Sequence, residues 1–429
     1  MLVELTIKNA LSYKDENVLS MLSNNYLQRG KSNKEKPVFE TFAGNILKTA
    51  LVFGPNASGK SNLLNILSRL KSMLSSNRLI NTKLPSMNFV LSETAREEPT
   101  EISIGFISDN KYYFYEIGFN LTVSYEILHI NDELYFERFV DSEGNSEIRG
   151  LKSELNYEKI LRPNSLLVYR LQDDNDKLIE KFYDWFENKL IILNDAPAFR
   201  AAFRFSKSLN KQVELLEAEP NKEIFVNFLK AADINVSNIE VVSRIRMRRI
   251  RLEEDSEFEE VEEQYKELML IHDVFNDEGK KEGELSFPIH LESRGTQKLI
   301  YLLLNLIDYS PERVIIMDEF DDSFHLKLST SLLTVFNSFY NKTQCIFTTH
   351  ETLLMDSCLR RDQIYFVEKD NKGVSTLFSL DDFEKESRQD VNNSKKYVEG
   401  RFGAVPIVFI DDMMRSLGKL EGNYEEKNS

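Results

Sequence analysis

The feature that most constrains the fold is a glycine-rich segment between an apolar run and an amphipathic run. Residues 47–53 (LKTALVF) predict a strand, and residues 62–70 predict a helix. The intervening GPNASGKS, residues 54–61, matches G-x-x-x-x-G-K-[ST] in the strand-to-helix context that this pattern requires. Its glycines let consecutive backbone N–H groups converge on phosphate oxygens, and the helix N-terminus adds partial positive charge. The segment therefore predicts a cradle for nucleotide phosphates.

The motif also assigns individual roles. Lys60 is expected to reach the β- and γ-phosphates, and the Ser61 hydroxyl is expected to ligate Mg²⁺. A flexible Gly/Ser loop before an ordinary helix is the alternative, which the flanking strand and helix patterns disfavour. The predicted nucleotide-binding residues are Gly54, Pro55, Asn56, Ala57, Ser58, Gly59, Lys60, Ser61 and Asn62.

Composition narrows the class of protein. A chain of 429 residues that is 41% hydrophobic is long enough for two or three globular domains. It has no apolar run of about 18 residues and no basic stretch before an apolar N-terminal segment, so we expect a cytoplasmic protein without a membrane span. Two cysteines, Cys345 and Cys358, and five histidines show no metal-ligand spacing. The net charge of −16 argues against a surface coated with nucleic acid, although a local basic groove stays compatible.

The first part of the chain predicts strands. Residues 2–8 alternate apolar and polar side chains, as a half-buried strand at the edge of the nucleotide domain does. Tyr13 follows this strand and would either stack on an adenine or pack internally. Residues 101–106 and 112–119 predict a hairpin, and residues 127–139 predict further antiparallel strands of a β-subdomain.

The middle of the chain predicts an inserted region. Apolar spacing is helical over 178–193 and 222–232. Residues 244–251 then hold five arginines, and residues 253–263 hold eight acidic residues. Opposite charges on neighbouring segments predict a hairpin or helical arm held by cross-pairs. The alternative is that the arginines contact a partner or nucleic acid, but the adjacent acids would compete for them.

The late part of the chain carries further candidate catalytic and metal-binding residues. VIIMDE, residues 314–319, is typical of a buried parallel strand whose carboxyl end opens into a ligand crevice. Asp318 would complete the Mg²⁺ shell, and Glu319 would polarise a water as general base. A second strand, 344–349, delivers His350, which could hydrogen-bond a γ-phosphate. Alone, the carboxylates would suit a strand-ending turn; together with the glycine-rich loop they predict an NTPase.

The order of these motifs resembles that of a known family. GPNASGKS, SRGTQKL (293–299), VIIMDE and TTH are similar to the nucleotide-binding heads of ABC-type ATPases of the SMC, Rad-fifty, RecF and OLD branch. Ser293, Gly295 and Leu299 match the signature S-G-G-E-x-x-L, whereas Arg294 and Thr296 depart from it. The chain more closely resembles the AAA ATPases of the RloA and AbiL kind from bacterial phage-defence loci. The segments that carry this resemblance are ESRGTQKLIYLLL, DEFDDSFH, TTHETLLMD, LRRDQIYFVEKD and KYVEGRFGAVP.

This resemblance, over residues 1–120 and 225–410, implies a fold. We expect an α/β ABC-type P-loop head, in which a mixed sheet is flanked by helices and joined by an antiparallel β-subdomain, carrying an inserted helical or hairpin lid. The expected division is 1–135 for the N-terminal half of the head, 136–284 for the insertion and 285–429 for the C-terminal half. The long separation of Gly54 from Glu319 without sustained heptads favours a compact lid or arm over a chromosome-tethering coiled coil.

The resemblance also implies roles. In such heads the signature of one subunit completes the ATP site of another, so Ser293 and Gly295 would contact a γ-phosphate in trans within a homodimer. Glu319, His350 and Lys60 are the implied catalytic residues, with His350 as the switch histidine. His325 stands where these heads usually place the D-loop aspartate, and residues 88–91 lack the glutamine of a Q-loop.

The expected function is that of an ATPase with ATP and Mg²⁺ as cofactors. Since no second catalytic set is apparent in the sequence, we expect the homodimer, or a higher oligomer, to regulate an effector nuclease or toxin encoded nearby in anti-phage or abortive-infection defence. No membrane partner is expected, and nucleic acid is not required. One alternative is a DNA repair or recombination ATPase of the RecF/SMC type that binds DNA through residues 244–251. Another is a regulatory module that sequesters a toxin and hydrolyses ATP slowly.

Overall fold

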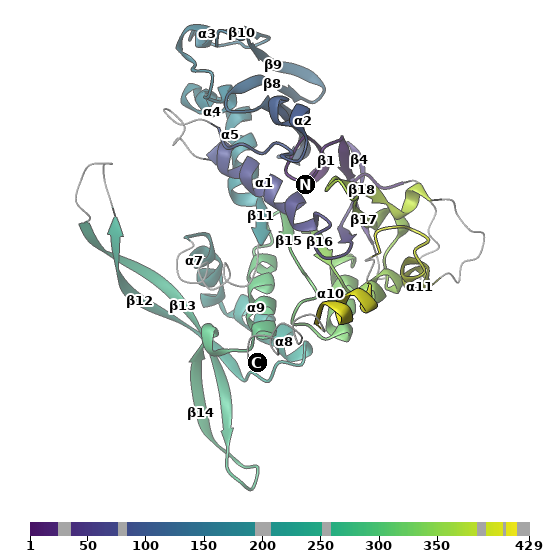
Figure 1. The fold of residues 1–429 in the computed structure, drawn as a ribbon. Helices are drawn as coiled ribbons and strands as arrows, with labels where there is room; N and C mark the ends of the chain where they lie inside the picture. Colours follow the sequence, from purple (N-terminus) through teal and green to yellow (C-terminus); the bar gives the residue numbers. More distant parts are fainter. Residues whose placement is uncertain are drawn as a thin grey trace, which may run out of the picture.

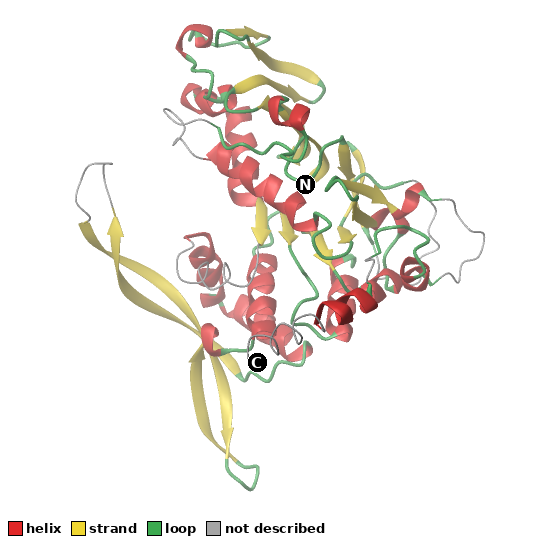
Figure 2. Ribbon diagram, in the orientation of Figure 1, coloured by secondary structure: helices red, strands yellow, loops and turns green. Residues whose placement is uncertain are grey.

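The computed structural model describes residues 1–24, 36–75, 84–193, 207–250, 259–383, 392–405 and 409–417. Within those ranges two large sheets form the head, and helix α1 (Lys60–Ser75) packs between them (Figure 1). Helices cover the opposite face of one of these sheets, and a separate β-structure projects from the head (Figure 2). The predicted mixed α/β architecture is confirmed.

The first large sheet has the strand order β11-β15-β16-β5-β17-β18 and is parallel except for β18. Its strands are β5 (Thr49–Phe53), β11 (Leu190–Leu193), β15 (Val314–Met317), β16 (Gln344–Thr349), β17 (Ile364–Lys369) and β18 (Ser375–Ser379). Alternate residues of β5 enter different cores: Ala50 and Val52 pack with α1, whereas Leu51 and Phe53 pack with the helices opposite. Both faces are buried, which explains why these strands read as continuous apolar runs.

The second large sheet is antiparallel, with the order β10-β9-β8-β7-β6-β1-β2. Its strands are β1 (Leu2–Lys8), β2 (Asn17–Ser20), β6 (Thr100–Ser108), β7 (Lys111–Phe119), β8 (Val123–Ile130), β9 (Glu133–Val140) and β10 (Ser146–Arg149). Asp109 and Asn110 both have positive φ, as the tight turn between β6 and β7 requires, so the predicted hairpin is confirmed. Strand β1 pairs with β2 and with β6, and it therefore lies inside its sheet.

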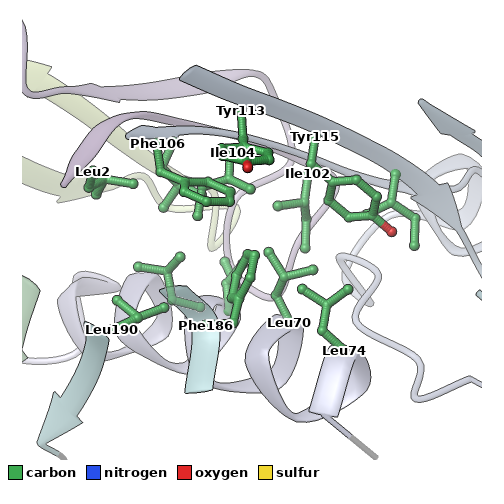
Figure 3. Packing of buried hydrophobic residues seen from close by; sticks show 14 of the residues in the cluster. Leu2, Leu70, Leu74, Ile102, Ile104, Phe106, Tyr113, Tyr115, Phe186 and Leu190 are labelled. Carbon is green, nitrogen blue, oxygen red and sulfur yellow. The ribbon is translucent and has the colours of Figure 1, made fainter. Parts of the chain in front are cut away.

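An aromatic and aliphatic core joins this sheet to α1. Figure 3 shows residues of β6 and β7, including Phe106 and Tyr115, facing Leu70 and Leu74 of α1. The ring of Phe106 stacks on that of Trp185 with their centroids 4.1 Å apart. The core therefore fixes α1, and with it the loop that precedes α1, against both sheets.

The structure corrects the predicted helix over 178–193. Helix α5 (Lys177–Asp184) continues as a π-helical turn, η3 (Trp185–Lys189), and Leu190–Leu193 then forms β11, which pairs in parallel with β15. The prediction is confirmed for 178–189 and wrong for 190–193, because Leu190 continues the helical apolar spacing while the run LIIL suits a buried strand equally well. Trp185 and Leu190 lie in the same core as α1, so this segment belongs to the head. The wider division at residues 135 and 284 stays a prediction.

The remaining elements are shorter or peripheral. The hairpin of β3 (Val38–Thr41) and β4 (Gly44–Leu47) lies beside β2. The other helices are α2 (Glu93–Glu97), α3 (Tyr157–Ile160), α4 (Leu167–Arg170), α7 (Lys207–Glu214), α8 (Glu219–Ala231), α9 (Arg294–Ile307), α10 (Leu326–Phe336) and α11 (Asn393–Val398). The prediction of a helix over 222–232 is confirmed by α8. Among the described residues, no helix combines the length and apolar character needed to cross a bilayer.

A three-stranded arm projects from the head as two hairpins (Figure 1). It consists of β12 (Asn238–Ile250), β13 (Glu259–Phe275) and β14 (Lys281–Pro288). Arg246 pairs with Glu263 at 2.7 Å, and Arg244 pairs with Glu267 at 3.0 Å. The predicted cross-paired hairpin is confirmed for these residues, whereas 251–258 lie outside the described residues.

A buried ion pair docks a connecting segment onto the antiparallel sheet. Glu126 on β8 lies opposite Arg138 on β9, and both side chains are fully buried. The Arg138 guanidinium donates to the Ser165 carbonyl at 2.6 Å, and Glu126 accepts from the Leu167 backbone N–H at 2.7 Å. The two charges therefore hold the start of α4 against the sheet.

We predict that Arg138→Ala lowers the free energy of unfolding by about 3–5 kcal/mol, because it leaves the Glu126 carboxylate buried without its charge partner. Urea denaturation followed by circular dichroism measures this change. Arg149→Ala is the matched control, since that arginine pairs with Glu147 at the exposed surface, and we expect its midpoint to stay near the parent value. Equal midpoints for the two variants would contradict a structural role for the buried pair.

Candidate nucleotide-binding site

The glycine-rich loop joins the carboxyl end of β5 to the N-terminus of α1. Both of its glycines are required because neighbouring strands approach too closely to leave room for a side chain. A Cβ at Gly54 would overlap the Val367 carbonyl oxygen of β17, and a Cβ at Gly59 would collide with the Ser375 hydroxyl of β18. Gly59 also has a backbone φ of +121°, which residues other than glycine rarely adopt. The loop is therefore packed against β17 and β18.

The nine predicted binding residues divide by exposure. Gly54, Ser58, Gly59 and Lys60 are buried, Pro55 and Asn62 are half-buried, and Asn56, Ala57 and Ser61 are exposed. The Lys60 ammonium folds back over the loop and donates to the Gly54 carbonyl at 2.7 Å and the Pro55 carbonyl at 3.0 Å. Burial lowers the pKa of Lys60 to about 8, while Asp318, Glu319 and Asp321 act in the opposite direction. Lys60 therefore lies within the field of the late carboxylates.

Strand order explains why these residues meet. Strands β15, β16 and β5 are parallel neighbours, so their carboxyl ends lie at one edge of the sheet. Asp318 and Glu319 follow β15, and His350 follows β16. His350 Nε2 lies 4.0 Å from Glu319 Oε1. The structure thus brings Lys60, Asp318, Glu319 and His350 together.

The titration of His350 reflects the same neighbours. Burial lowers the pKa of His350, and the Lys60 charge lowers it further. The carboxylates of Asp321 and Asp318 and a hydrogen bond with the Gly54 backbone oppose these effects. His350 is therefore a neutral imidazole at neutral pH, close to the first residue of the loop.

Thr348 is a further residue of the site, and no sequence motif indicates its role. Its hydroxyl donates to Asp318 Oδ1 and accepts from the Glu319 N–H at 2.8 Å. Glu319 has a φ of +48°, which is uncommon for a residue with a side chain. Thr348 is fully buried and holds this turn in place. Its only sequence signal is its place two residues before His350 at the end of a strand.

The signature residues lie apart from the loop within one chain. Ser293 caps α9 by accepting from the Thr296 N–H at 3.1 Å, and its side chain is exposed. Gly295 approaches the Ser323 carbonyl so closely that a Cβ would lie 2.5 Å from that oxygen. In the part of the chain that the structure describes, no hydrogen bond or ion pair links Ser293 or Gly295 to residues 54–62.

Lys298 connects the signature helix to the turn that follows β15. Its side chain is 7% exposed, and its ammonium donates to the backbone carbonyls of Glu319 and, at 3.1 Å, Asp322. It also lies 5.5 Å from the centroid of the Phe324 ring. The backbone at Glu319 is therefore anchored by Thr348 from β16 and by Lys298 from α9.

Three other candidates take structural places outside the nucleotide contacts. Tyr13 is fully buried and donates its hydroxyl to the Gly59 carbonyl at 3.0 Å, so its ring packs internally and is not available to an adenine. His325 caps α10 through its Nδ1 atom. Arg244 and Arg246 are engaged with glutamates of β13, which gives the nucleic-acid alternative no support.

The site suits Mg²⁺ bound together with phosphates rather than by protein alone. Within the described ranges, no group of three or more His, Cys, Asp or Glu side chains is placed to hold a metal. Mg²⁺ commonly binds one or two protein oxygens together with nucleotide phosphates. Ser61 in the first turn of α1 and Asp318 after β15 could supply such oxygens. The Ser58 hydroxyl is buried in the loop and has no hydrogen-bond partner among the described residues.

These features define the class of protein as a P-loop ATPase head of the ABC type: a phosphate loop between strand and helix, carboxylates after a neighbouring parallel strand, and an adjoining antiparallel sheet. The sequence profile of the family described as "AAA domain, putative AbiEii toxin, Type IV TA system" matches residues 50–356, and the chain belongs to this family.

Solved structures with a similar fold include heads of SMC proteins. The SMC head domain from Thermotoga maritima is 15% identical, covers 88% of this chain and 98% of its own, and has a TM-score of 0.38. The Smc head domain with an extended coiled coil bound to the C-terminal domain of ScpA, derived from Pyrococcus furiosus, is 13% identical, covers 88% and 96%, and has a TM-score of 0.43. A comparison with curated proteins finds no match.

We predict that Lys60→Met stabilises the nucleotide-free protein at pH 7 by up to ~3 kcal/mol, the equivalent of a pKa lowered from 10.5 to about 8. Because the folded pKa is the lower one, the destabilisation is fully present below pH 8 and disappears as pH rises to 10.5. Melting temperatures at pH 7 and pH 10 measure this difference.

Lys71→Met is the control for this experiment, since the pKa of Lys71 is also lowered to about 8 but its ammonium donates to the Leu190 carbonyl. Mg²⁺ and ADP should reduce the difference in melting temperature between the parent and Lys60→Met. They should leave the difference between the parent and Lys71→Met unchanged. A pH-independent gap for Lys60→Met would contradict the burial of a charged Lys60.

Proposed function

We propose that the protein binds Mg²⁺ and ATP at residues 54–62 and hydrolyses the nucleotide. The observation that carries this proposal is the convergence of Lys60, Asp318, Glu319 and His350 at the carboxyl edge of three neighbouring parallel strands. Bound ATP would supply a triphosphate whose γ-phosphoryl group is attacked by water.

Each residue has a role that its position supports. Lys60 exchanges the Gly54 and Pro55 carbonyls for phosphate oxygens, which relieves the burial of its charge. Ser61 and Asp318 hold Mg²⁺, and Thr348 orients Asp318. Glu319 takes a proton from the attacking water, and the neutral His350 beside it marks the γ-phosphate position.

We further propose that two copies form a homodimer around two nucleotides, with scope for a higher oligomer. Ser293 is exposed at the N-terminus of the 14-residue helix α9, where a partially positive helix end suits a phosphate. Among the residues that the structure describes, no hydrogen bond or ion pair links Ser293 or Gly295 to the loop of their own chain, so completion of the partner's site is the arrangement that uses them. Crystals grown with a non-hydrolysable analogue would test this, and a Ser293 turned away from every nucleotide would refute it.

At the level of biology, we propose a sensor or regulator of an effector nuclease or toxin encoded nearby, in anti-phage or abortive-infection defence. The family description supports a toxin-related context. The projecting arm of β12–β14 supports a protein-binding role, because Arg244 and Arg246 are neutralised by glutamates of the same arm. On this proposal, nucleotide state in the head controls the partner's activity.

We predict that Glu319→Gln lowers the ATPase turnover number at least about 100-fold while MgATP binding is retained, because the amide cannot accept a proton from water. Size-exclusion chromatography with ATP should then show an accumulated dimer. Glu351→Gln is the control, since Glu351 lies two residues after Thr349 but its carboxylate caps the turn at Leu353. Normal turnover and no dimer for Glu319→Gln would exclude Glu319 as the base.

We predict that the protein, co-expressed with the product of the adjacent gene, retains that product on affinity purification and releases at least half of it when MgATP is added. Lys60→Ala should retain the partner but show no release, because it lacks the ammonium that binds phosphate. The measurement is the amount of partner eluted with and without nucleotide. Equal release from the parent and Lys60→Ala would separate any partner from the nucleotide site.

A further inference from the structure

We infer that Tyr13 and Ser375 are positioning residues that form the phosphate cradle by holding the backbone carbonyls of residues 58 and 59. This inference rests on the proposed function and adds a mechanism for it. The Ser375 hydroxyl on β18 donates to the Ser58 carbonyl at 2.5 Å, and the Tyr13 hydroxyl donates to the Gly59 carbonyl at 3.0 Å.

Peptide geometry turns these bonds into control of the cradle. In a trans peptide the C=O of one residue and the N–H of the next point in opposite directions. The Ser58 carbonyl therefore fixes the direction of the Gly59 N–H, and the Gly59 carbonyl fixes that of the Lys60 N–H. Among the described residues, neither of these N–H groups donates to a protein acceptor. Both carbonyls are held on the side of Tyr13 and Ser375, so both donors point toward the opposite, open side of the loop.

The two holding residues are themselves rigid. Tyr13 and Ser375 are fully buried, and the Ser375 N–H donates to the Ser12 carbonyl at 2.7 Å. The Ser12 hydroxyl in turn accepts from the Asn62 side chain at 2.8 Å. Segment 12–13, β18 and the first turn of α1 therefore form a closed set of hydrogen bonds, which we call the clasp, around residues 58–62.

The clasp gives a packing reason for one glycine of the phosphate motif and explains a tyrosine outside that motif. Gly59 must lack a side chain because a Cβ would strike both the Ser375 and the Ser12 hydroxyls. The Gly59 carbonyl accepts one hydrogen bond from the Leu63 N–H, at 3.2 Å, in the first turn of α1. Its second lone pair accepts from the Tyr13 hydroxyl, which explains why a tyrosine stands at this position. Residues about 46 and 317 positions from the loop thus determine its shape.

The test measures binding of Mg²⁺ with ATP and of Mg²⁺ with inorganic tripolyphosphate by isothermal calorimetry. Tyr13→Phe and Ser375→Ala should each raise both Kd values about 5- to 10-fold, the equivalent of one lost orienting hydrogen bond, and the double variant should raise them further. Parallel loss for tripolyphosphate shows that the effect is on phosphate and not on the base. In turnover assays, KM should rise while kcat changes less than twofold.

Tyr365→Phe is the matched control. Tyr365 is a buried tyrosine whose hydroxyl donates to the Ser20 carbonyl at 2.7 Å, so this variant loses the same type of bond away from the loop. Its Kd values should equal those of the parent. If Tyr13→Phe and Ser375→Ala also bind as the parent does, the clasp is refuted while the ATPase proposal stands. If the parent binds neither MgATP nor magnesium tripolyphosphate, both the proposed function and the proposed role of the clasp are refuted.

Discussion

The parallel pairing of β15, β16 and β5 is the constraint on which the rest of the structure depends. Because both faces of these strands are buried, polar groups can occur only where the strands end. The ends carry Asp318, Thr348 with His350, and the glycine-rich loop, and adjacency in the sheet brings them within hydrogen-bonding or ionic range. A strand inserted between any two of these neighbours would separate the groups by about 5 Å.

The turn after β15 is held from two directions, and this matters because its backbone is unfavourable. A left-handed conformation at a residue such as Glu319 costs of order 1–3 kcal/mol and persists only where surrounding contacts determine it. Thr348 supplies one contact through the Glu319 N–H, and Lys298 supplies another through the Glu319 carbonyl. The Lys298 ammonium thus connects the signature helix α9 to the backbone of the proposed catalytic residue, Glu319.

Local motifs predicted the site better than periodicity predicted the elements around it. The loop, the VIIMDE strand and the TTH strand carry their chemistry in consecutive residues, so their positions could be inferred without knowing the packing. Thr348, Lys298 and Ser375 act through contacts between segments distant in sequence, and a serine or lysine gives no signal of such a contact. Leu190–Leu193 was misassigned as helix because four apolar residues suit either structure, and pairing with β15 decides the outcome. For Tyr13 the sequence leaves adenine stacking and internal packing open, and burial shows that the ring packs internally while its hydroxyl contacts the loop.

The same contacts connect the arm to the site. Strand β14 ends at Pro288, and the chain reaches Ser293 after a single turn, η5 (Ile289–Leu291). His272 on β13 lies 2.8 Å from the Glu292 carboxylate, and Gln297 of α9 donates to the Glu292 carbonyl at 2.6 Å. Ser293 is therefore fixed to the arm on one side and to α9 on the other. Since α9 also carries Lys298, one continuous set of contacts runs from the arm through the N-terminus of α9 to the backbone at Glu319.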